Sequence, residues 1–265
     1  MSSPLTAAAP GIHPTAVIDP EARIAGSAAI GPFSVIGPGV EIGERVRIGS
    51  QVLVERDSRL AEDCIVHHGA VLGTDAQDLK YRGEPSRLEV GPRTTIREYA
   101  TVNRGTAEGG VTRVGADCLL MAYSHVAHDC RIGDHAIVSN SVQLAGHVEM
   151  GPWVTIGGVT GVHQFVRIGP HAFVGACSKC TQDVPPFLLV DGHPCTARGI
   201  NLIGLKRRGF SDEVMRRLRK VFRTVYKSNR NVGDALDEIA GWEETGPEVD
   251  QFVDFVRGSE RGIVS

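Results

Sequence analysis

Residues 29–48 read AIGPFSVIGPGVEIGERVRI, with isoleucine at every sixth position. Counted in sixes, the chain has an aliphatic residue at every step through Ile12, Ile18, Ile24, Ile30, Ile36, Ile42, Ile48, Val54, Leu60, Val66 and Leu72. The ladder resumes at Val90, Ile96 and Val102, and runs again from Val114 through Leu120, Val126, Ile132, Val138, Leu144, Met150, Ile156, Val162, Ile168 and Val174 to Cys180. A period of six is neither the 3.6-residue period of a helix nor the two-residue alternation of an ordinary strand.

The ladder predicts a β-solenoid in which each six-residue unit forms one flat face and points its aliphatic residue inward. Three faces close a triangular coil of 18 residues, and successive coils stack at the strand spacing of about 4.8 Å. Each coil buries its apolar side only against its neighbours, so many coils are needed. Glycine often follows the aliphatic residue, as at Gly31, Gly37 and Gly43, and we expect it to suit the corners.

The repeat breaks twice and ends near residue 190. The stretches near 74–89 and 104–113 are polar or glycine-rich and lack aliphatic anchors, so we expect projecting loops. We therefore predict a solenoid over residues 1–190 and a small α-helical C-terminal domain over residues 191–265. Within that domain Ser211 is the expected N-cap of a helix over 211–228, followed by helices near 234–240 and 247–257.

Composition and charge narrow the functional classes. A formal net charge of -3 argues against nucleic acid as a partner of the whole protein. The six cysteines do not form the dense framework of a small secreted domain. The N-terminal MSSPLTAAAPGIHP lacks the pattern of a signal peptide, and no apolar run approaches the ~20 residues of a membrane span. We expect a cytoplasmic protein.

The chemistry concentrates in Ser124–Cys130, which reads SHVAHDC. In the 18-residue frame Gly146 lies one coil beyond His128, and His147 one coil beyond Asp129. Cys130 takes an inward position and is a poor nucleophile candidate. The frame therefore collects four polar side chains into one patch, with two more on the following coil: His125, His128, Asp129 and His147, then His163 and Gln164.

A histidine beside a carboxylate can act as a general base, and the N–H of Gly146 could stabilise an oxyanion. This combination favours acyl transfer to a hydroxyl or amine by direct attack. Two alternatives stay open from the residues alone. Three imidazoles on one face could instead hold zinc, as in a hexapeptide carbonic anhydrase, or the chain could be a non-catalytic scaffold. Cys177 and Cys180 have redox or zinc spacing, but Cys180 falls on the inward ladder.

Several specific segments resemble the UDP-N-acetylglucosamine O-acyltransferase family of lipid A biosynthesis. They are QDLKYRGEP (77–85), HVAHDC (125–130), NSVQLAGHV (140–148), GVHQFVRIG (161–169), QDVPPF (182–187) and GINLIGLKRRGF (199–210). The resemblance implies a left-handed parallel β-helix and an enzyme that moves an (R)-3-hydroxyacyl group from acyl carrier protein to the 3-hydroxyl of UDP-N-acetylglucosamine. It also implies a cytoplasmic homotrimer with active sites between prisms, without a metal or cofactor. The related N-acyltransferases carry an extra N-terminal domain, for which a ladder beginning at Ile12 leaves no room.

The resemblance also implies residue roles. His128 would be the general base, Asp129 its orienting acid and Gly146 the oxyanion donor. Ala176 would lie where side-chain bulk sets acyl length, and Ile203 stands where the family commonly has glutamate. The substrate-binding residues would be Asp78, Lys80, His125, His147, His163, Gln164, Asn201, Arg207 and Arg208, the last three on the nucleotide phosphates.

One 25-residue span of the C-terminal region is strongly basic, although the whole chain is acidic. A solvated helix face would account for it, but the asymmetry favours a dock for an acidic carrier protein. The residues are Lys206, Arg207, Arg208, Arg216, Arg217, Arg219, Lys220, Arg223, Lys227 and Arg230.

Overall fold

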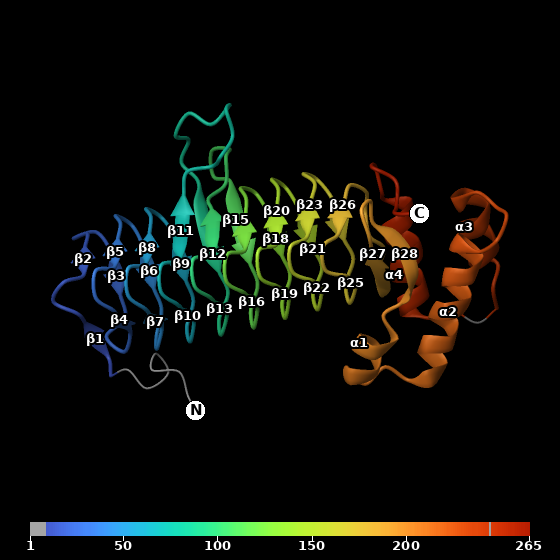
Figure 1. Ribbon diagram of the computed structural model, residues 1–265, viewed down its shortest axis with the longest axis horizontal. Helices are drawn as coiled ribbons and strands as arrows, with labels where there is room; N and C mark the ends of the chain where they lie inside the picture. The colour runs from blue at the N-terminus through green and yellow to red at the C-terminus, as the bar shows by residue number, and fades with distance from the viewer. Residues whose placement is uncertain (1–8, 244) are drawn as a thin grey trace.

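A computed structural model describes residues 9–243 and 245–265 (Figure 1). The chain forms a left-handed parallel β-helix shaped as a triangular prism, with helices gathered at its C-terminal end. The predicted fold class is confirmed. Residues 1–8, part of the N-terminal stretch in which we expect no signal peptide, lie outside the described residues, as does Glu244.

Three sheets form the faces of the prism. In the described residues sheet A pairs, in order, β1 (Gly11–Ile12), β4 (Ala29–Ile30), β7 (Arg47–Ile48), β10 (Ile65–Val66), β13 (Thr95–Ile96), β16 (Leu119–Leu120), β19 (Ile137–Val138), β22 (Thr155–Ile156), β25 (Phe173–Val174), β27 (Leu188–Asp191) and β28 (Thr196–Ile200). Sheet B pairs β2 (Val17–Ile18), β5 (Val35–Ile36), β8 (Leu53–Val54), β11 (Val71–Thr74), β14 (Thr101–Asn103), β17 (His125–Val126), β20 (Gln143–Leu144), β23 (Gly161–Val162) and β26 (Lys179–Cys180). Sheet C pairs β3 (Arg23–Ile24), β6 (Glu41–Ile42), β9 (Arg59–Leu60), β12 (Arg87–Val90), β15 (Val111–Val114), β18 (Arg131–Ile132), β21 (Glu149–Met150) and β24 (Arg167–Ile168).

The aliphatic ladder fills the inside of the prism. Val126 pairs with Leu144 one coil further on, and Leu144 pairs with Val162 in the coil after that. All three side chains are buried. Burying an aliphatic side chain of this size stabilises the fold by roughly 1.5–3 kcal/mol, so the stacked ladder is the main source of stability.

The corners differ from expectation. Glycines such as Gly31 and Gly133 do not take the left-handed conformation; a Cβ on either would lie 2.5–2.6 Å from backbone of the next coil. They are glycine because the coils approach closely there. The left-handed residues come two positions later and are mostly not glycine, for example Asp129 with φ 58° and His147 with φ 60°.

Two loops leave the same edge of the prism. Residues 75–86 connect β11 to β12, and residues 104–110 connect β14 to β15. Each connection therefore runs from sheet B to sheet C, along what we call the B–C edge. The first loop projects clear of the prism in Figure 1.

The C-terminal region begins with a strand where we expected only helices. β28 pairs antiparallel with β27 and extends sheet A. The helices are α1 (Leu202–Arg207), α2 (Asp212–Tyr226), α3 (Val232–Ala240) and α4 (Pro247–Arg257). Ser211 caps α2 by accepting a hydrogen bond from the N–H of Val214, as predicted. Among the described residues no helix has the length and apolar character needed to cross a membrane.

Aromatic rings stack along the edge where sheet C passes to sheet A, the C–A edge. His135 stacks on Trp153, Trp153 on His171 and His171 on Phe187. Phe210 meets His171 edge-on with ring centroids 5.0 Å apart. Burial, reinforced by the nearby positive charge of Arg208, lowers the pKa of His171 to about 4 from an ordinary 6.5. The folded chain therefore favours the neutral imidazole.

His171→Phe should make the fold less sensitive to acid. Between pH 6.5 and about 4 the unfolded chain binds a proton at His171 that the folded chain does not, so the free energy of unfolding falls as the pH falls. Phenylalanine keeps the ring stack and removes this proton uptake. Melting temperatures at pH 7 and pH 5 should differ less for His171→Phe than for the wild type or for a control at the exposed His13. Equal losses in all three would contradict the prediction.

Candidate active site

The site lies on the B–C edge, where consecutive coils place their corner residues in register. His128 and Asp129 follow β17, and Gly146 and His147 follow β20 one coil further on. The N–H of His147 donates to the carbonyl of His128 over 3.0 Å, which locks the two corners together. The predicted alignment of Gly146 with His128, and of His147 with Asp129, is present in the structure.

His128 and Asp129 form a close pair. The imidazole Nδ1 lies 2.9 Å from Asp129 Oδ2, and the two side chains are only 12% and 14% exposed. Because Nδ1 faces a carboxylate oxygen, it carries the proton in the neutral imidazole and leaves Nε2 free as an acceptor. Thr106 donates its hydroxyl to Asp129 Oδ2 over 2.7 Å. His147 reaches the same oxygen from 3.7 Å.

The Asp129 carboxylate is held ionised. Burial acts to raise the pKa of Asp129, but hydrogen bonds from Thr106 and His128 outweigh it and the pKa is lowered overall. His125 has a lowered pKa because it is buried and because His128 lies close to it. Its Nδ1 is 2.7 Å from the hydroxyl of Thr101. An ionised carboxylate and a neutral imidazole therefore share this edge.

Gly146 is in direct contact with the His128 ring. A Cβ on Gly146 would lie 2.5 Å from Cε1 and 2.6 Å from Nε2 of His128. Its N–H makes no hydrogen bond within the described residues. The same slot, two positions after the inward residue, holds proline at Pro32, Pro92, Pro152 and Pro170, which confirms that the fold needs no donor there. Gly146 therefore combines an N–H without a partner in the described part of the chain and close packing against the His128 ring.

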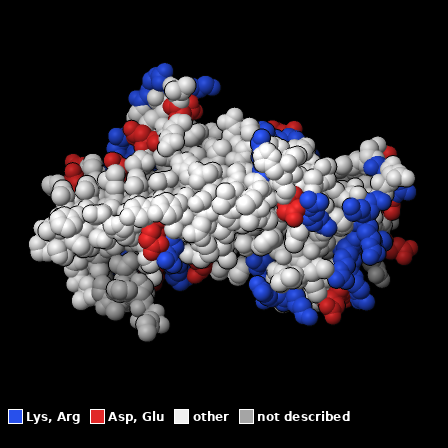
Figure 2. Space-filling view, in the orientation of Figure 1, with Lys and Arg blue, Asp and Glu red and all other residues white. Residues whose placement is uncertain are grey.

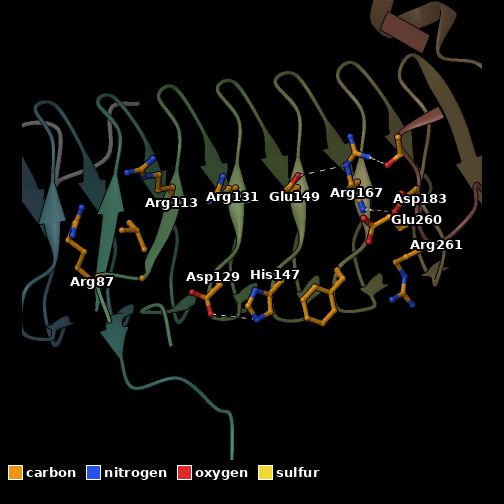
Figure 3. A pocket seen from close by; sticks show the side chains of 15 residues that line it. Arg87, Arg113, Asp129, Arg131, His147, Glu149, Arg167, Asp183, Glu260 and Arg261 are labelled. Atoms are coloured by element: carbon orange, nitrogen blue, oxygen red, sulfur yellow. Dashed lines mark hydrogen bonds and ion pairs between the residues drawn. The ribbon is translucent and has the colours of Figure 1, made fainter. Parts of the chain in front are cut away.

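An open groove of about 830 Å³ runs from this edge across sheet C (Figure 3). Asp129 and His147 lie side by side along one margin of the groove. Outward-facing charged residues of sheet C, among them Arg113, Arg131, Glu149 and Arg167, line much of the rest, and Gly258, Glu260 and Arg261 after α4 also contribute. Cys130 points away from it, and burial raises the pKa of its thiol to about 12, so the thiolate is not available.

His128, Asp129 and His147 are also the candidate ligands of a metal site. One ligand atom each from His128, Asp129 and His147 lies within 4.8 Å of the others. In this arrangement Asp129 Oδ2 already accepts hydrogen bonds from His128 and Thr106. The carboxylate is thus engaged as the partner of an imidazole, the role expected beside a general base.

Known proteins identify this architecture. A family model described as "Udp N-acetylglucosamine O-acyltransferase; Domain 2" matches residues 183–264, and a bacterial transferase hexapeptide model matches residues 21–56 and 112–146. An acyl-[acyl-carrier-protein]--UDP-N-acetylglucosamine O-acyltransferase of Burkholderia lata is 46% identical over 258 residues, 96% of this chain and 98% of that protein. The chain belongs to the UDP-N-acetylglucosamine O-acyltransferase family.

Solved structures of this acyltransferase family agree with the assignment. The UDP-N-acetylglucosamine acyltransferase of Francisella novicida has a TM-score of 0.93 at 38% identity, covering 96% of this chain and 94% of its own. The enzyme from Moraxella catarrhalis has a TM-score of 0.93 at 39% identity, covering 96% and 99%. The similarity spans the prism and the C-terminal helices together.

Four further residues that we associate with this acyltransferase site lie along the B–C edge. His163 and Gln164 follow β23, so Gln164 stands one coil beyond Gly146, and both are exposed. Asp78 and Lys80 lie in the 75–86 loop, where Asp78 Oδ1 accepts the N–H of Lys80 over 2.9 Å. The edge thus carries most of the predicted substrate-binding set.

The predicted phosphate ligands lie on another edge. Arg208 packs its guanidinium over Trp153 on the C–A edge and donates to the carbonyl of Trp153. The buried Asn201 caps α1 and donates to the carbonyl of His171, so both ends of its carboxamide are used within the chain. Arg207 is exposed at the end of α1, and Ala176 lies at the corner after β25 where sheet A passes to sheet B. Their roles toward substrate stay predictions.

Thr106 is the contact that sequence reasoning missed. It lies in the 104–110 loop, where the six-residue frame is interrupted and no longer predicts which side chains meet. Arg104, two residues earlier, is buried and marks the segment as fixed, but that burial cannot be read from the sequence.

Gly146→Ala should greatly reduce the rate of acyl transfer. Its new Cβ would overlap the His128 ring, which must move away from its present place against Gly146. A shift of about 1 Å in a catalytic group can cost on the order of 100-fold in rate, so kcat should fall by about that factor. Gly26→Ala is the matched control, because Gly26 occupies the same corner slot with nothing within 4 Å of its Cβ position. A Gly146→Ala enzyme as active as this control would contradict the prediction.

Proposed function

We propose that this chain transfers an (R)-3-hydroxyacyl group from acyl carrier protein to the 3-hydroxyl of UDP-N-acetylglucosamine, the first step of lipid A biosynthesis, in the cytoplasm. The observation that carries the proposal is the His128–Asp129 pair packed against Gly146, whose N–H has no partner among the described residues. The name of the Burkholderia lata relative supplies the donor and the acceptor. We propose no cofactor.

The geometry supports direct attack by the sugar hydroxyl. Nε2 of His128 takes the hydroxyl proton as the oxygen bonds to the thioester carbon, and Asp129 stabilises the imidazolium that forms. The N–H of Gly146 stabilises the negative charge on the carbonyl oxygen. When the carbon–sulfur bond breaks, the imidazolium returns the proton to the departing thiol of the carrier. Atoms and charge balance without a covalent acyl-enzyme.

Substrate binding then needs a second copy of the chain. The base lies on the B–C edge, whereas Arg207 and Arg208 sit beside the C–A edge of the same prism. A homotrimer with sites between prisms would bring the two edges together. Exposed apolar side chains support self-association: Leu79 on the projecting loop is 96% exposed, and Phe33, Tyr123 and Val159 are exposed at corners of the A–B edge.

The acyl carrier protein would dock on α2. Its outward face carries exposed basic residues, and Figure 2 shows Lys and Arg gathered over this end of the molecule. Arg217 is committed elsewhere, since it pairs with Glu213 and Glu248. Among the described residues, those that remain exposed and without an ion pair on α2 and its C-terminal end are Arg216, Arg219, Lys220, Arg223 and Lys227; Arg230 is exposed but pairs with Glu238. An acidic carrier would be steered to this face by charge.

His128→Ala should abolish the reaction while leaving the protein folded. Loss of a general base costs about 100- to 10,000-fold in rate. The readout is mass-detected acyl transfer from a panel of hydroxyacyl carrier proteins to UDP-N-acetylglucosamine. UDP-N-acetylglucosamine should still raise the melting temperature of the variant, which shows that the site is formed. Retained turnover would remove His128 as the base.

Mixed assemblies test the shared site. His128→Ala and Arg208→Ala are each expected to be inactive alone. If one site combines His128 of one copy with Arg208 of its neighbour, random co-assembly at equal amounts restores about a quarter of the sites. Co-expression followed by activity measurement should therefore recover turnover. Recovery of none, with mixed assemblies verified by mass, would show that each site is built within one chain.

A further inference from the structure

The 104–110 loop closes over the Asp129 carboxylate. Thr106 donates to both oxygens of that group, its hydroxyl to Oδ2 over 2.7 Å and its backbone N–H to Oδ1 over 3.2 Å. A Cβ on Gly105 or Gly110 would lie 2.9 Å or 3.3 Å from Oδ1. Glycine at these two positions is what lets the loop reach the carboxylate.

Because Thr106 holds both oxygens of the Asp129 carboxylate, it also sets the direction of the hydrogen bond between Asp129 and His128. His128 Nδ1 approaches Oδ2 at 2.9 Å and His147 Nε2 approaches it at 3.7 Å. The backbone N–H of Asp129 also donates to the hydroxyl of Thr112 over 2.8 Å. Asp129 is thus held both at its backbone N–H and at its two carboxylate oxygens. Rotation of the carboxylate plane would break the hydrogen bonds to Thr106 and to His128 together.

The segment before Thr106 is anchored by a buried arginine. Arg104 is 1% exposed. Its Nε donates to the carbonyl of Gly73 over 2.8 Å, and its terminal nitrogens donate to the carbonyls of Ser86 and Arg56. The hydroxyl of Ser86 donates in turn to the carbonyl of Gly105 over 2.6 Å. Gly73 lies just before the 75–86 loop and Ser86 is the last residue of that loop. The Arg104 guanidinium therefore joins the start of the 104–110 loop to both ends of the 75–86 loop.

We infer that Thr106 is a positioning residue, which holds the Asp129 carboxylate in the orientation that aligns His128 for proton transfer. The inference deepens the proposed function and rests on it. Thr106 touches neither the base nor its reacting nitrogen; it acts through Asp129. Loss of its hydroxyl should slow the chemical step and leave the binding of UDP-N-acetylglucosamine unchanged.

The test compares Thr106→Val with Thr106→Ser in the full-length enzyme. Valine keeps the shape and removes the hydroxyl, so kcat should fall about tenfold, the value of one hydrogen bond to a charged group. KM for UDP-N-acetylglucosamine should stay within about twofold. Serine restores the donor and should return kcat to within about twofold of the wild type. Thr106→Ala provides a second hydroxyl-free variant if valine unfolds the protein.

Thr94→Val is the matched control. Thr94 is buried, and its hydroxyl joins the carbonyl of Gly115 to the N–H of Cys118, at a position following β12 rather than in the loop. It should lose stability but keep kcat per folded enzyme. A wild-type kcat in Thr106→Val, or a Thr106→Ser variant as slow as Thr106→Val, would overturn the inference. The proposed function would still stand in that case if His128→Ala were inactive. Full activity of His128→Ala would instead remove the proposed function itself.

Discussion

Backbone hydrogen bonding between successive coils is the constraint on which this structure depends. The N–H of His125 donates to the carbonyl of Val142, and the N–H of Ala127 to that of Leu144. These bonds set a fixed rise between coils and forbid a slip, because a slip by a single position would turn the inward ladder outward. Side chains on neighbouring coils therefore align in columns, and a reaction centre can be assembled from residues far apart in the chain.

The corner slot shows how such a column becomes reactive. Two positions after an inward residue, the backbone N–H lies outside the ladder of hydrogen bonds between coils: that of Gly146 has no partner among the described residues, whereas that of Ala116 donates to Asp134 Oδ1. Proline occupies this slot at several corners, so the fold does not require a backbone donor there. On the B–C edge the slot holds His128 and then Gly146, so an imidazole packs against a residue whose N–H has no partner among the described residues. The fold supplies the donor, and the sequence decides whether it is used.

What could be predicted follows from the same periodicity. The inward ladder, the helix cap at Ser211 and the alignment of His147 with Asp129 all derive from local patterns with a fixed period. The reason for the corner glycines, such as Gly31 and Gly133, could not be predicted in this way. In the sequence, a glycine required by the close approach of two coils looks the same as a glycine required by a turn. The packing of Arg208 on Trp153 and the contact of Thr106 with Asp129 join segments whose distance no repeat controls.

The two loops show why that information is lost at the edge that matters most. Gln143 pairs with His125 across one regular coil, whereas Thr101 pairs with Val71, and His125 with Thr101, across coils that the loops lengthen. The strands that flank each loop still pair in parallel, as β12 does with β9 and with β15. A solenoid tolerates insertions at a corner because this pairing survives them. The inserted residues do not have to follow the six-residue pattern of inward side chains. They can therefore fold over Asp129, which a regular coil could not do.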